Sequence, residues 1–235
     1  MKQIELLKWD TDFFKFPIGR LEIDSFNSLG EIQKALDESS FRVVCIQIEN
    51  PTKDEIEQIS RLAPLMDEKV IFEKRVCSVP LSASQRIEKY KGSITSELLA
   101  LAWTSGTFSR FNLDANFRPY FKQLYQSWLE RSIQGDLADA VFVAYDGSLP
   151  VGFVTVAYQE EMSGKIGLIA VSWDYRRKGI ASLLLRNAEA WCHENEYKVI
   201  QVATQARNVS ACRLYEKYGY QHKTKFGIFH YWKEA

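Results

Sequence analysis

The strongest constraint on the fold of this chain is a strand, a helix and a second strand that follow one another between Gly164 and Thr204. The strand-like run KIGLIAVSW leads into a helical run that reaches about Asn195, and the strand-like run KVIQVAT comes next. Parallel strands of one sheet need such a long connection, which is nearly always a right-handed crossover. These two strands are therefore predicted to be parallel neighbours.

The runs on either side predict a mixed α/β fold. DAVFVAYDG and VGFVTVAYQ precede the crossover, and the turn-forming strings DGSLP and EEMSGK make this edge of the sheet antiparallel. In the first third of the chain, helical runs alternate with the strand-like runs IELLKWD, IGRLEID, RVVCIQIE and KVIFEKRVC. Residues 78–96 lose this periodicity and are predicted to form a linker. We therefore expect a smaller α/β domain over residues 1–85 and a second domain over residues 86–235, with a mixed, mainly antiparallel sheet flanked by helices.

Charge and composition argue against several classes of function. Lysine and arginine number 30, as do aspartate and glutamate, so no overall field draws the chain to nucleic acid or to an anionic membrane. The cysteines are far apart without C-x-x-C spacing, which predicts reduced thiols and no metal site; they are Cys45, Cys77, Cys192 and Cys212. The N-terminal string lacks the layout of a signal peptide, and no uncharged run approaches the roughly 18 residues of a membrane span. We expect a soluble cytoplasmic protein; its oligomeric state, including a homodimer, stays open.

Three consecutive cations, Arg176, Arg177 and Lys178, lie between the end of a predicted strand and the start of a predicted helix. Ligands of open α/β sheets bind at such places, and a helix N-terminus offers backbone N–H groups and partial positive charge to a phosphate. Gly179 has no Cβ to hold a ligand away from the backbone, and Ala181 is nearly as small. A solvated turn explains this string equally well, and the common nucleotide motifs G-x-x-x-x-G-K-[ST] and G-x-G-x-x-G are absent.

Two motifs carry a resemblance to a known family. Arg-x-x-Gly-x-Ala, at Arg176, Gly179 and Ala181, resembles the acetyl-CoA signature [QR]-x-x-G-x-[GA] of the GCN5-related N-acetyltransferases (GNAT). The later string NVSACRLYEKYGY is similar to that family's N-x-x-A-x-x-x-Y-x-x-x-G-[FY], matched by Asn208, Ala211, Tyr215, Gly219 and Tyr220. The resemblance runs from about Ser96 to the end of the chain. It implies a GNAT fold for the second domain and leaves open a partial GNAT-like unit before it.

The resemblance also implies a site for acetyl-CoA. The backbone N–H groups that hold the pyrophosphate correspond to Arg177, Lys178, Gly179, Ile180 and Ala181. The preceding strand has a bulge in this family and presents its backbone to the pantetheine arm, which carries over to Leu168, Ala170 and Val171. Asn208 is expected either to hydrogen-bond this arm or simply to cap the helix that follows.

Tyr215 corresponds to the family's general acid. A tyrosine with a pKa near 10 stays protonated at neutral pH and can protonate a departing thiolate. Without the motif, an ordinary core aromatic is the favoured interpretation of Tyr215. The general base is undetermined, because a water chain is as good a candidate as His193, His222 or His230.

The amine acceptor is suggested by strings outside these motifs. WDTDFF and SRFNLDANF resemble N-acetyltransferases that act on nucleotide-linked 4-amino-4,6-dideoxy sugars, of the TDP-fucosamine type. Arg110 and Phe111 are candidates to pair a charge with a stacking face for the nucleotide, against the alternative of a surface cation and a core ring. Three functions remain: a sugar-nucleotide N-acetyltransferase, the same chemistry on another small amine or a protein N-terminus, and a non-catalytic acetyl-CoA-binding module. The third is disfavoured because a pure binder has no need of Tyr215.

Overall fold

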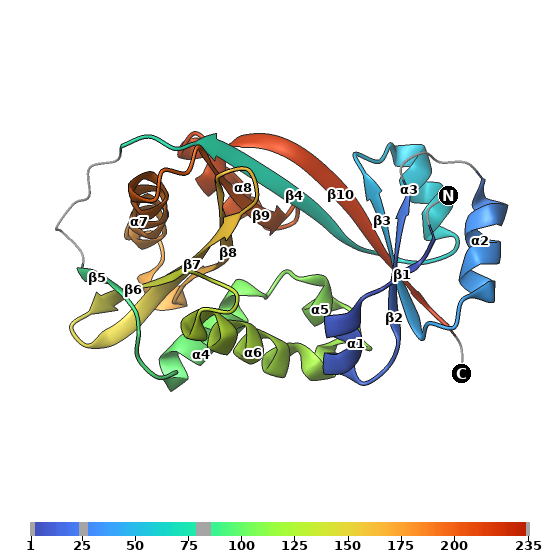
Figure 1. Cartoon of the computed structure of the whole chain (residues 1–235), viewed down its shortest axis with the longest axis horizontal. Helices are drawn as coiled ribbons and strands as arrows, with labels where there is room; N and C mark the ends of the chain where they lie inside the picture. Colours follow the sequence, from blue (N-terminus) through green and yellow to red (C-terminus); the bar gives the residue numbers. More distant parts are fainter. Residues whose placement is uncertain (1–2, 24–27, 79–85, 234–235) are drawn as a thin grey trace. The chain divides into compact units, whose positions relative to one another are not determined.

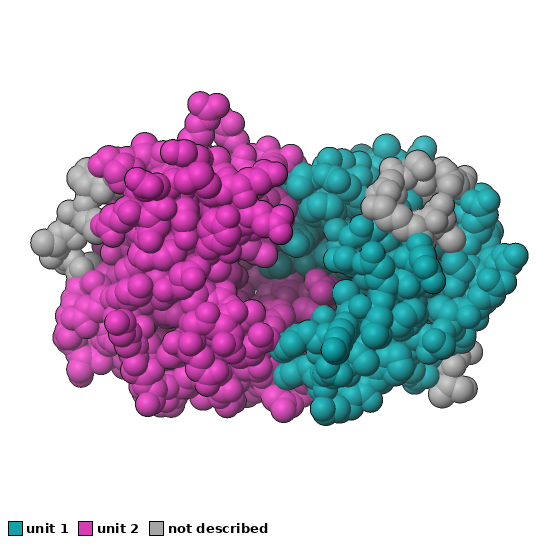
Figure 2. All heavy atoms as spheres, in the orientation of Figure 1, with its two compact units in different colours: residues 1–70, 205–207, 224–235 teal, residues 71–204, 208–223 magenta. Residues whose placement is uncertain are grey.

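The structure, a computed structural model, describes residues 3–23, 28–78 and 86–233. It groups the chain into two compact units, the first comprising residues 1–70, 205–207 and 224–235 and the second residues 71–204 and 208–223 (Figure 2). Strands β4 (Leu65–Arg75) and β10 (Gln221–Trp232) contribute residues to both units. This grouping differs from the expected division after residue 85, because the end of the chain returns to pair with β3 (Val43–Glu49) in the first unit.

The first unit is a small α/β sheet with the strand order β1-β2-β3-β10-β4 (Figure 1). Strands β2 and β3 are parallel, and β10 is antiparallel to β3. Its core consists of apolar side chains from the strands and two helices, including Leu36, Ile46, Ile59 and Phe229. The remaining elements are β1 (Glu5–Leu6), α1 (Lys8–Phe14), β2 (Ile18–Ile23), α2 (Leu29–Glu38) and α3 (Lys53–Ser60).

One expected strand of this unit is wrong. The run IELLKWD forms only the two-residue β1, and its second half belongs to helix α1. The rings of Trp9 and Phe13 stack with their centroids 5.2 Å apart, the contact expected for residues four apart on a helix, and Phe14 is buried. The four-residue spacing of the aromatic side chains therefore favours a helix here, although the composition of the segment had suggested a strand.

The second unit has the strand order β10-β4-β9-β8-β7-β6-β5 (Figure 1). β6, β7 and β8 are antiparallel, and β8 and β9 are parallel, which confirms the predicted crossover through α7. Its strands are β5 (Arg86–Lys89), β6 (Ala140–Asp146), β7 (Leu149–Gln159), β8 (Ser163–Val171) and β9 (Val199–Gln205). Its helices are α4 (Ser96–Ser105), α5 (Arg110–Leu113), η1 (Arg118–Tyr120), α6 (Phe121–Gln134), η2 (Trp173–Tyr175), α7 (Ile180–Glu194) and α8 (Val209–Lys217).

The predicted linker over residues 78–96 is correct only in part. Residues 79–85 lie outside the described residues, and residues 86–89 form β5, which pairs antiparallel with β6. This edge strand is short and mostly exposed. Because backbone pairing and not an apolar face holds it in the sheet, its sequence carries no strand periodicity.

Helices cover both faces of the second unit's sheet (Figure 1). Leu98 and Leu101 of α4 pack with Phe153 of β7. Gly152, the preceding residue, faces the other side, where an added Cβ would lie 3.1 Å from Leu184 and 3.3 Å from Ile180 of α7. Since side chains of a strand alternate between faces, α4 and α7 lie on opposite sides of the sheet.

A largely buried ion pair joins β4 to α7 in this unit. Lys74 Nζ lies 2.8 Å from Glu189 Oε2, and the two side chains are 20% and 3% exposed. We expect Lys74→Met to lower the free energy of unfolding by about 2 kcal/mol, because it strands a buried carboxylate while Lys74 itself is partly solvated. Urea unfolding measures this loss. The double variant Lys74→Met/Glu189→Leu removes both charges and should recover most of it; equal losses in both variants would contradict the explanation.

Candidate acetyl-CoA site and general acid

The loop between β8 and α7 contains two residues in the left-handed region. Gly179 is the N-cap of α7 with φ of 83°, and Arg177 has φ of 63°. Gly179 has no side chain to cap the first turn, and an added Cβ would meet no atom within 4 Å. The first N–H groups of α7 thus begin beside open space, as an anion site at a helix N-terminus requires.

The cations of this loop lie on aromatic rings. The Arg176 guanidinium is 4.5 Å from the Trp173 ring, and its Nε donates a hydrogen bond to the carbonyl of Val171 at 3.3 Å. Lys178 Nζ lies 4.6 Å from the Tyr175 ring. These contacts hold two positive charges beside the start of α7, and Arg177 and Lys178 are exposed.

Strands β8 and β9 separate beside this loop. Their parallel register runs from Ser163 opposite Val199 to Ile166 opposite Val202 and ends there, although both strands continue. At the same place β8 shifts register against β7, and Leu168 N donates a hydrogen bond to Thr155 Oγ1 at 2.8 Å. This bulge turns β8 away from β9 and opens a gap between the two strands.

The three strand residues carried over from the family lie along this gap. Leu168 is at the bulge, and Ala170 and Val171 follow it with buried side chains, opposite Phe153 and Gly152 of β7. Contact of these residues with a pantetheine arm stays a prediction.

Helix α8 follows β9 and carries Tyr215. Asn208 Oδ1 accepts a hydrogen bond from Ala211 N at 3.3 Å, so Asn208 caps this helix, and its Nδ2 donates to Thr204 Oγ1. The Tyr215 ring is 2% exposed and lies 5.6 Å from the ring of Phe72 on β4. Burial raises the pKa of Tyr215, so its hydroxyl stays protonated at neutral pH, and its role as general acid stays a prediction.

The candidate acceptor residues have a structural role of their own. Phe111 is 5% exposed, with its ring 5.5 Å from Phe117 and 5.7 Å from Trp128. The Arg110 guanidinium lies 4.3 Å from the Phe111 ring. The core alternative therefore accounts for Phe111, whereas contact of Arg110 with an acceptor stays a prediction.

The three histidines are divided between helix α7 and strand β10. His193 is in the last turn of α7, His222 packs its ring 6.0 Å from Phe72, and His230 is buried on β10. None of the four cysteines forms a disulfide in the described residues, and burial raises the pKa of the Cys192 thiol to about 12. Across residues 3–23, 28–78 and 86–233, no three acidic, histidine or cysteine side chains gather to hold a metal ion. No helix in the described part of the chain is long and apolar enough to cross a membrane.

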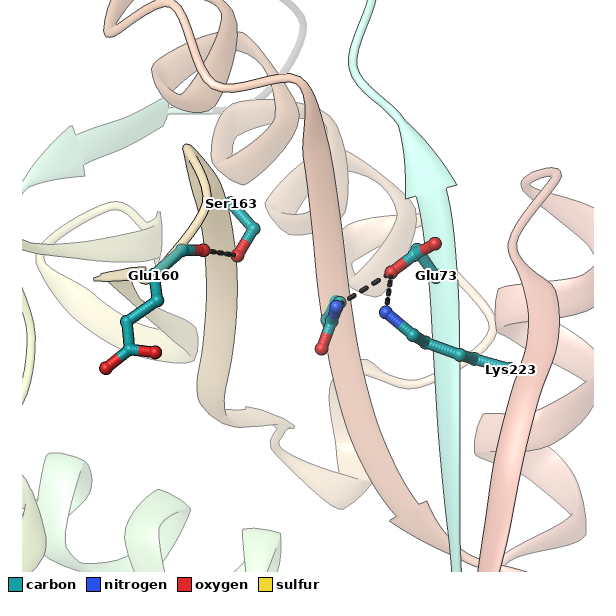
Figure 3. Close-up of polar contacts among 5 residues, drawn as sticks. Glu73, Glu160, Ser163 and Lys223 are labelled. Carbon is teal, nitrogen blue, oxygen red and sulfur yellow. Dashed lines mark hydrogen bonds and ion pairs between the residues drawn. The ribbon is translucent and has the colours of Figure 1, made fainter.

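Three strands bring together a polar cluster that sequence reasoning missed. Glu73 of β4 accepts hydrogen bonds from Gln201 Nε2 of β9 at 2.7 Å and from Lys223 Nζ of β10 at 2.5 Å (Figure 3). Because these residues are 128 and 150 positions apart in the chain, no local pattern could have linked them.

Comparisons with known proteins place this geometry in a family. A sequence model of the acetyltransferase (GNAT) family matches residues 102–220. Streptothricin acetyltransferase A of Bacillus subtilis is 33% identical over 101 residues, which are 43% of this chain and 58% of that protein. Spore coat polysaccharide biosynthesis protein SpsD of the same organism is 27% identical over 144 residues, 60% of this chain and 49% of that protein. The chain thus matches only about half the length of these curated relatives.

The fold is also similar to that of solved structures. A GCN5-related N-acetyltransferase from Kribbella flavida superposes with a TM-score of 0.58 at 11% identity, over 91% of this chain and 80% of that one. At this identity the likeness concerns the fold alone, and it agrees with the predicted mixed sheet flanked by helices.

Proposed function

The chain belongs to the acetyltransferase (GNAT) family, and from that premise we propose that it is an acetyl-CoA-dependent N-acetyltransferase. The observation that carries the proposal is the coincidence, in one unit, of an open helix N-terminus at Gly179 and the strand gap that begins after Ile166. A diphosphate and an extended arm joined to it need these two features next to each other.

The residues present fit this cosubstrate. Backbone N–H groups from Arg177 to Ala181 would bind the pyrophosphate, and the open space within 4 Å of an added Cβ at Gly179 supports a close approach. The backbone of β8 from Leu168 to Val171 would hold the arm in the gap. When bound, acetyl-CoA supplies a thioester whose carbonyl carbon accepts the nucleophile and whose thiolate departs.

Tyr215 is the proton donor in this proposal. Its buried hydroxyl stays protonated at neutral pH. It lies on α8, the helix that directly follows strand β9. Asn208 caps that helix and so helps to position Tyr215. A mutation of Asn208 would therefore act on catalysis through Tyr215. A proton given to the departing sulfur makes it a better leaving group.

For the acceptor, we propose the amine of a nucleotide-linked amino sugar of the TDP-4-amino-4,6-dideoxyhexose type. The support is the resemblance of WDTDFF and SRFNLDANF to such enzymes, together with the likeness to a polysaccharide biosynthesis protein. Arg110, which is half-buried, is the candidate to offset the sugar nucleotide's phosphates, whereas Phe111 is too buried to stack a base. The likeness to streptothricin acetyltransferase A favours a different small amine as the second candidate.

Thiol release from acetyl-CoA with a panel of amines tests the acceptor. We expect TDP-4-amino-4,6-dideoxy sugars to give the highest kcat/KM, followed by unrelated small amines such as streptothricin and spermidine, with peptide N-termini last. The same sugar nucleotide without its amino group is the matched control and should release no thiol. If another amine is acetylated efficiently and no sugar nucleotide is, that amine replaces the sugar nucleotide as the proposed acceptor. If the protein binds acetyl-CoA but acetylates no amine, only the binding module remains.

A further inference from the structure

Glu73 and its two partners lie where β8 leaves β9. Gln201, whose side chain bonds Glu73, directly precedes Val202, the last residue of β9 in register with β8. On β8, Lys165 lies opposite Gln201 and directly precedes Ile166, the last residue of β8 in register with β9. The carboxylate of Glu73 therefore lies across β9 from the inner end of the strand gap, where the proposed pantetheine arm would end.

Glu73 lies on the face of the sheet opposite Tyr215. Its neighbours Phe72 and Lys74 reach the other face, where Phe72 contacts the Tyr215 ring and Lys74 binds Glu189 of α7. Because successive side chains of a strand alternate, Glu73 points away from α7 and α8. Phe72 thus packs against the proposed acid on one face of the sheet, and the carboxylate of Glu73 lies on the other face.

The carboxylate is both oriented and accessible. Both donors bind the same oxygen, Oε2, and Figure 3 shows Glu73 and Lys223 pointing toward each other from neighbouring strands. The other oxygen is turned away from these donors. The side chain of Glu73 is 30% exposed and that of Lys223 is 47% exposed, so a ligand can reach the pair.

We propose that Glu73 is the catalytic base that accepts the proton of the acceptor amine, an inference that rests on the N-acetyltransferase function proposed above. The amine nitrogen bonds to the acetyl carbon as the carbon–sulfur bond breaks. The proton lost by the amine goes to the Glu73 carboxylate, and the departing sulfur receives the proton of Tyr215. With base and acid on opposite faces of the sheet, proton acceptance and donation occur at separate places. Loss of the proton from the exposed Glu73 and gain of a proton by Tyr215 then complete the cycle.

The plain alternative is a cross-strand ion pair without a catalytic role. A second pair on the same two strands, Glu68 with Lys225 at 2.9 Å, has similar exposure and lies beside Ala206, beyond the end of β9. It offers a matched control because Glu68→Gln makes the same chemical change. Exposed pairs of this kind contribute about 1 kcal/mol or less, so both variants should remain folded.

The experiment uses the full chain and the amine that the wild type acetylates best in the panel. We expect Glu73→Gln to lower kcat about a hundredfold and to abolish the rise of kcat with pH on the acid side, which reports the base in the complex. Gln201 and Lys223 face Glu73 from the neighbouring strands, and Lys165 lies beyond Gln201. These groups are the same in the wild type and in Glu73→Gln, so a change in the pH profile reports Glu73 itself. Glu68→Gln should keep the wild-type kcat and pH profile.

Two further readouts separate a base from a structural carboxylate. Calorimetry of the same amine, with CoA in place of acetyl-CoA so that no transfer occurs, should show at least about fivefold weaker binding to Glu73→Gln, because a carboxylate that receives the amine's proton also attracts its ammonium form. Formate should restore part of the turnover of Glu73→Ala. Lys223→Met breaks the same ion pair but keeps the carboxylate, and its loss of kcat should be smaller than that of Glu73→Gln.

Each outcome is decisive. Wild-type kcat and pH profile in Glu73→Gln, or an equal loss in Glu68→Gln, would overturn the role of Glu73 while leaving the acetyltransferase intact. A wild-type chain that binds acetyl-CoA but acetylates none of the amines would overturn the proposed function itself, and the role of Glu73 with it.

Discussion

Tyr215→Phe should keep the affinity of the protein for acetyl-CoA and lose turnover by about a hundredfold to ten-thousandfold, the range typical of general acid catalysis. The substitution removes only a hydroxyl, so the ring keeps its contacts with Phe72 and Tyr220. Calorimetry gives the affinity, and steady-state thiol release gives kcat. Since burial raises the pKa of Tyr215, its protonated form should persist, and this residue should cause no fall of kcat until pH exceeds the ordinary tyrosine value of about 10.

Tyr220→Phe is the matched control for this prediction. Tyr220 is as buried as Tyr215, with its ring 5.8 Å away, and the family signature accepts phenylalanine at this position. The control should retain kcat within a few-fold of wild type. If Tyr215→Phe also turns over at nearly the wild-type rate, with chemistry shown to be rate-limiting, then Tyr215 is a core aromatic and not the acid.

Gly179→Val should weaken acetyl-CoA binding about a hundredfold while the protein stays folded. A β-branched residue at φ of 83° is strained, and its side chain would occupy the open space from which a pyrophosphate approaches the first N–H groups of α7. Loss of one or two hydrogen bonds to a charged group costs about 1.5–3 kcal/mol each, which corresponds to that change in affinity. Calorimetry with CoA measures it.

Gly135→Val separates the strain from the blocked approach. Gly135 ends α6 with φ of 93°, and an added Cβ there also meets nothing within 4 Å. It should lower stability about as much as Gly179→Val, with CoA affinity unchanged. Unchanged affinity in Gly179→Val itself would remove the loop from the proposed site.

The crossover from β8 through α7 to β9 was predictable because its signals are local. Each strand is one apolar run, the helix has its own period, and only a long connection joins parallel neighbours. The hairpins before it followed from turn residues in the same way. The loop at Gly179 was predictable too, since a glycine in a left-handed N-cap after a strand leaves its mark in a short string.

Other elements were decided by contacts beyond the local string. The segment from Lys8 is a helix in which Trp9 and Phe13 stack, and residues 86–89 form a strand because β6 supplies a partner for their backbone. Asn208 could be a cap or a ligand from its sequence position, and the hydrogen bond from Ala211 N shows that it is at least the cap. Burial of Phe111 likewise came from rings that the string RFNL does not contain.

By itself, then, the sequence determined most of the elements, the parallel crossover and two motifs that resemble the family's acetyl-CoA loop and general acid, because each is written in residues close together in the chain. Only the tertiary structure decided where β8 parts from β9, which faces Phe72 and Glu73 occupy, and that Gln201 and Lys223 meet at one carboxylate. The physical reason is that strand register and pairing are set by backbone hydrogen bonds and packing between distant segments. These side chains become neighbours only after the sheet has formed.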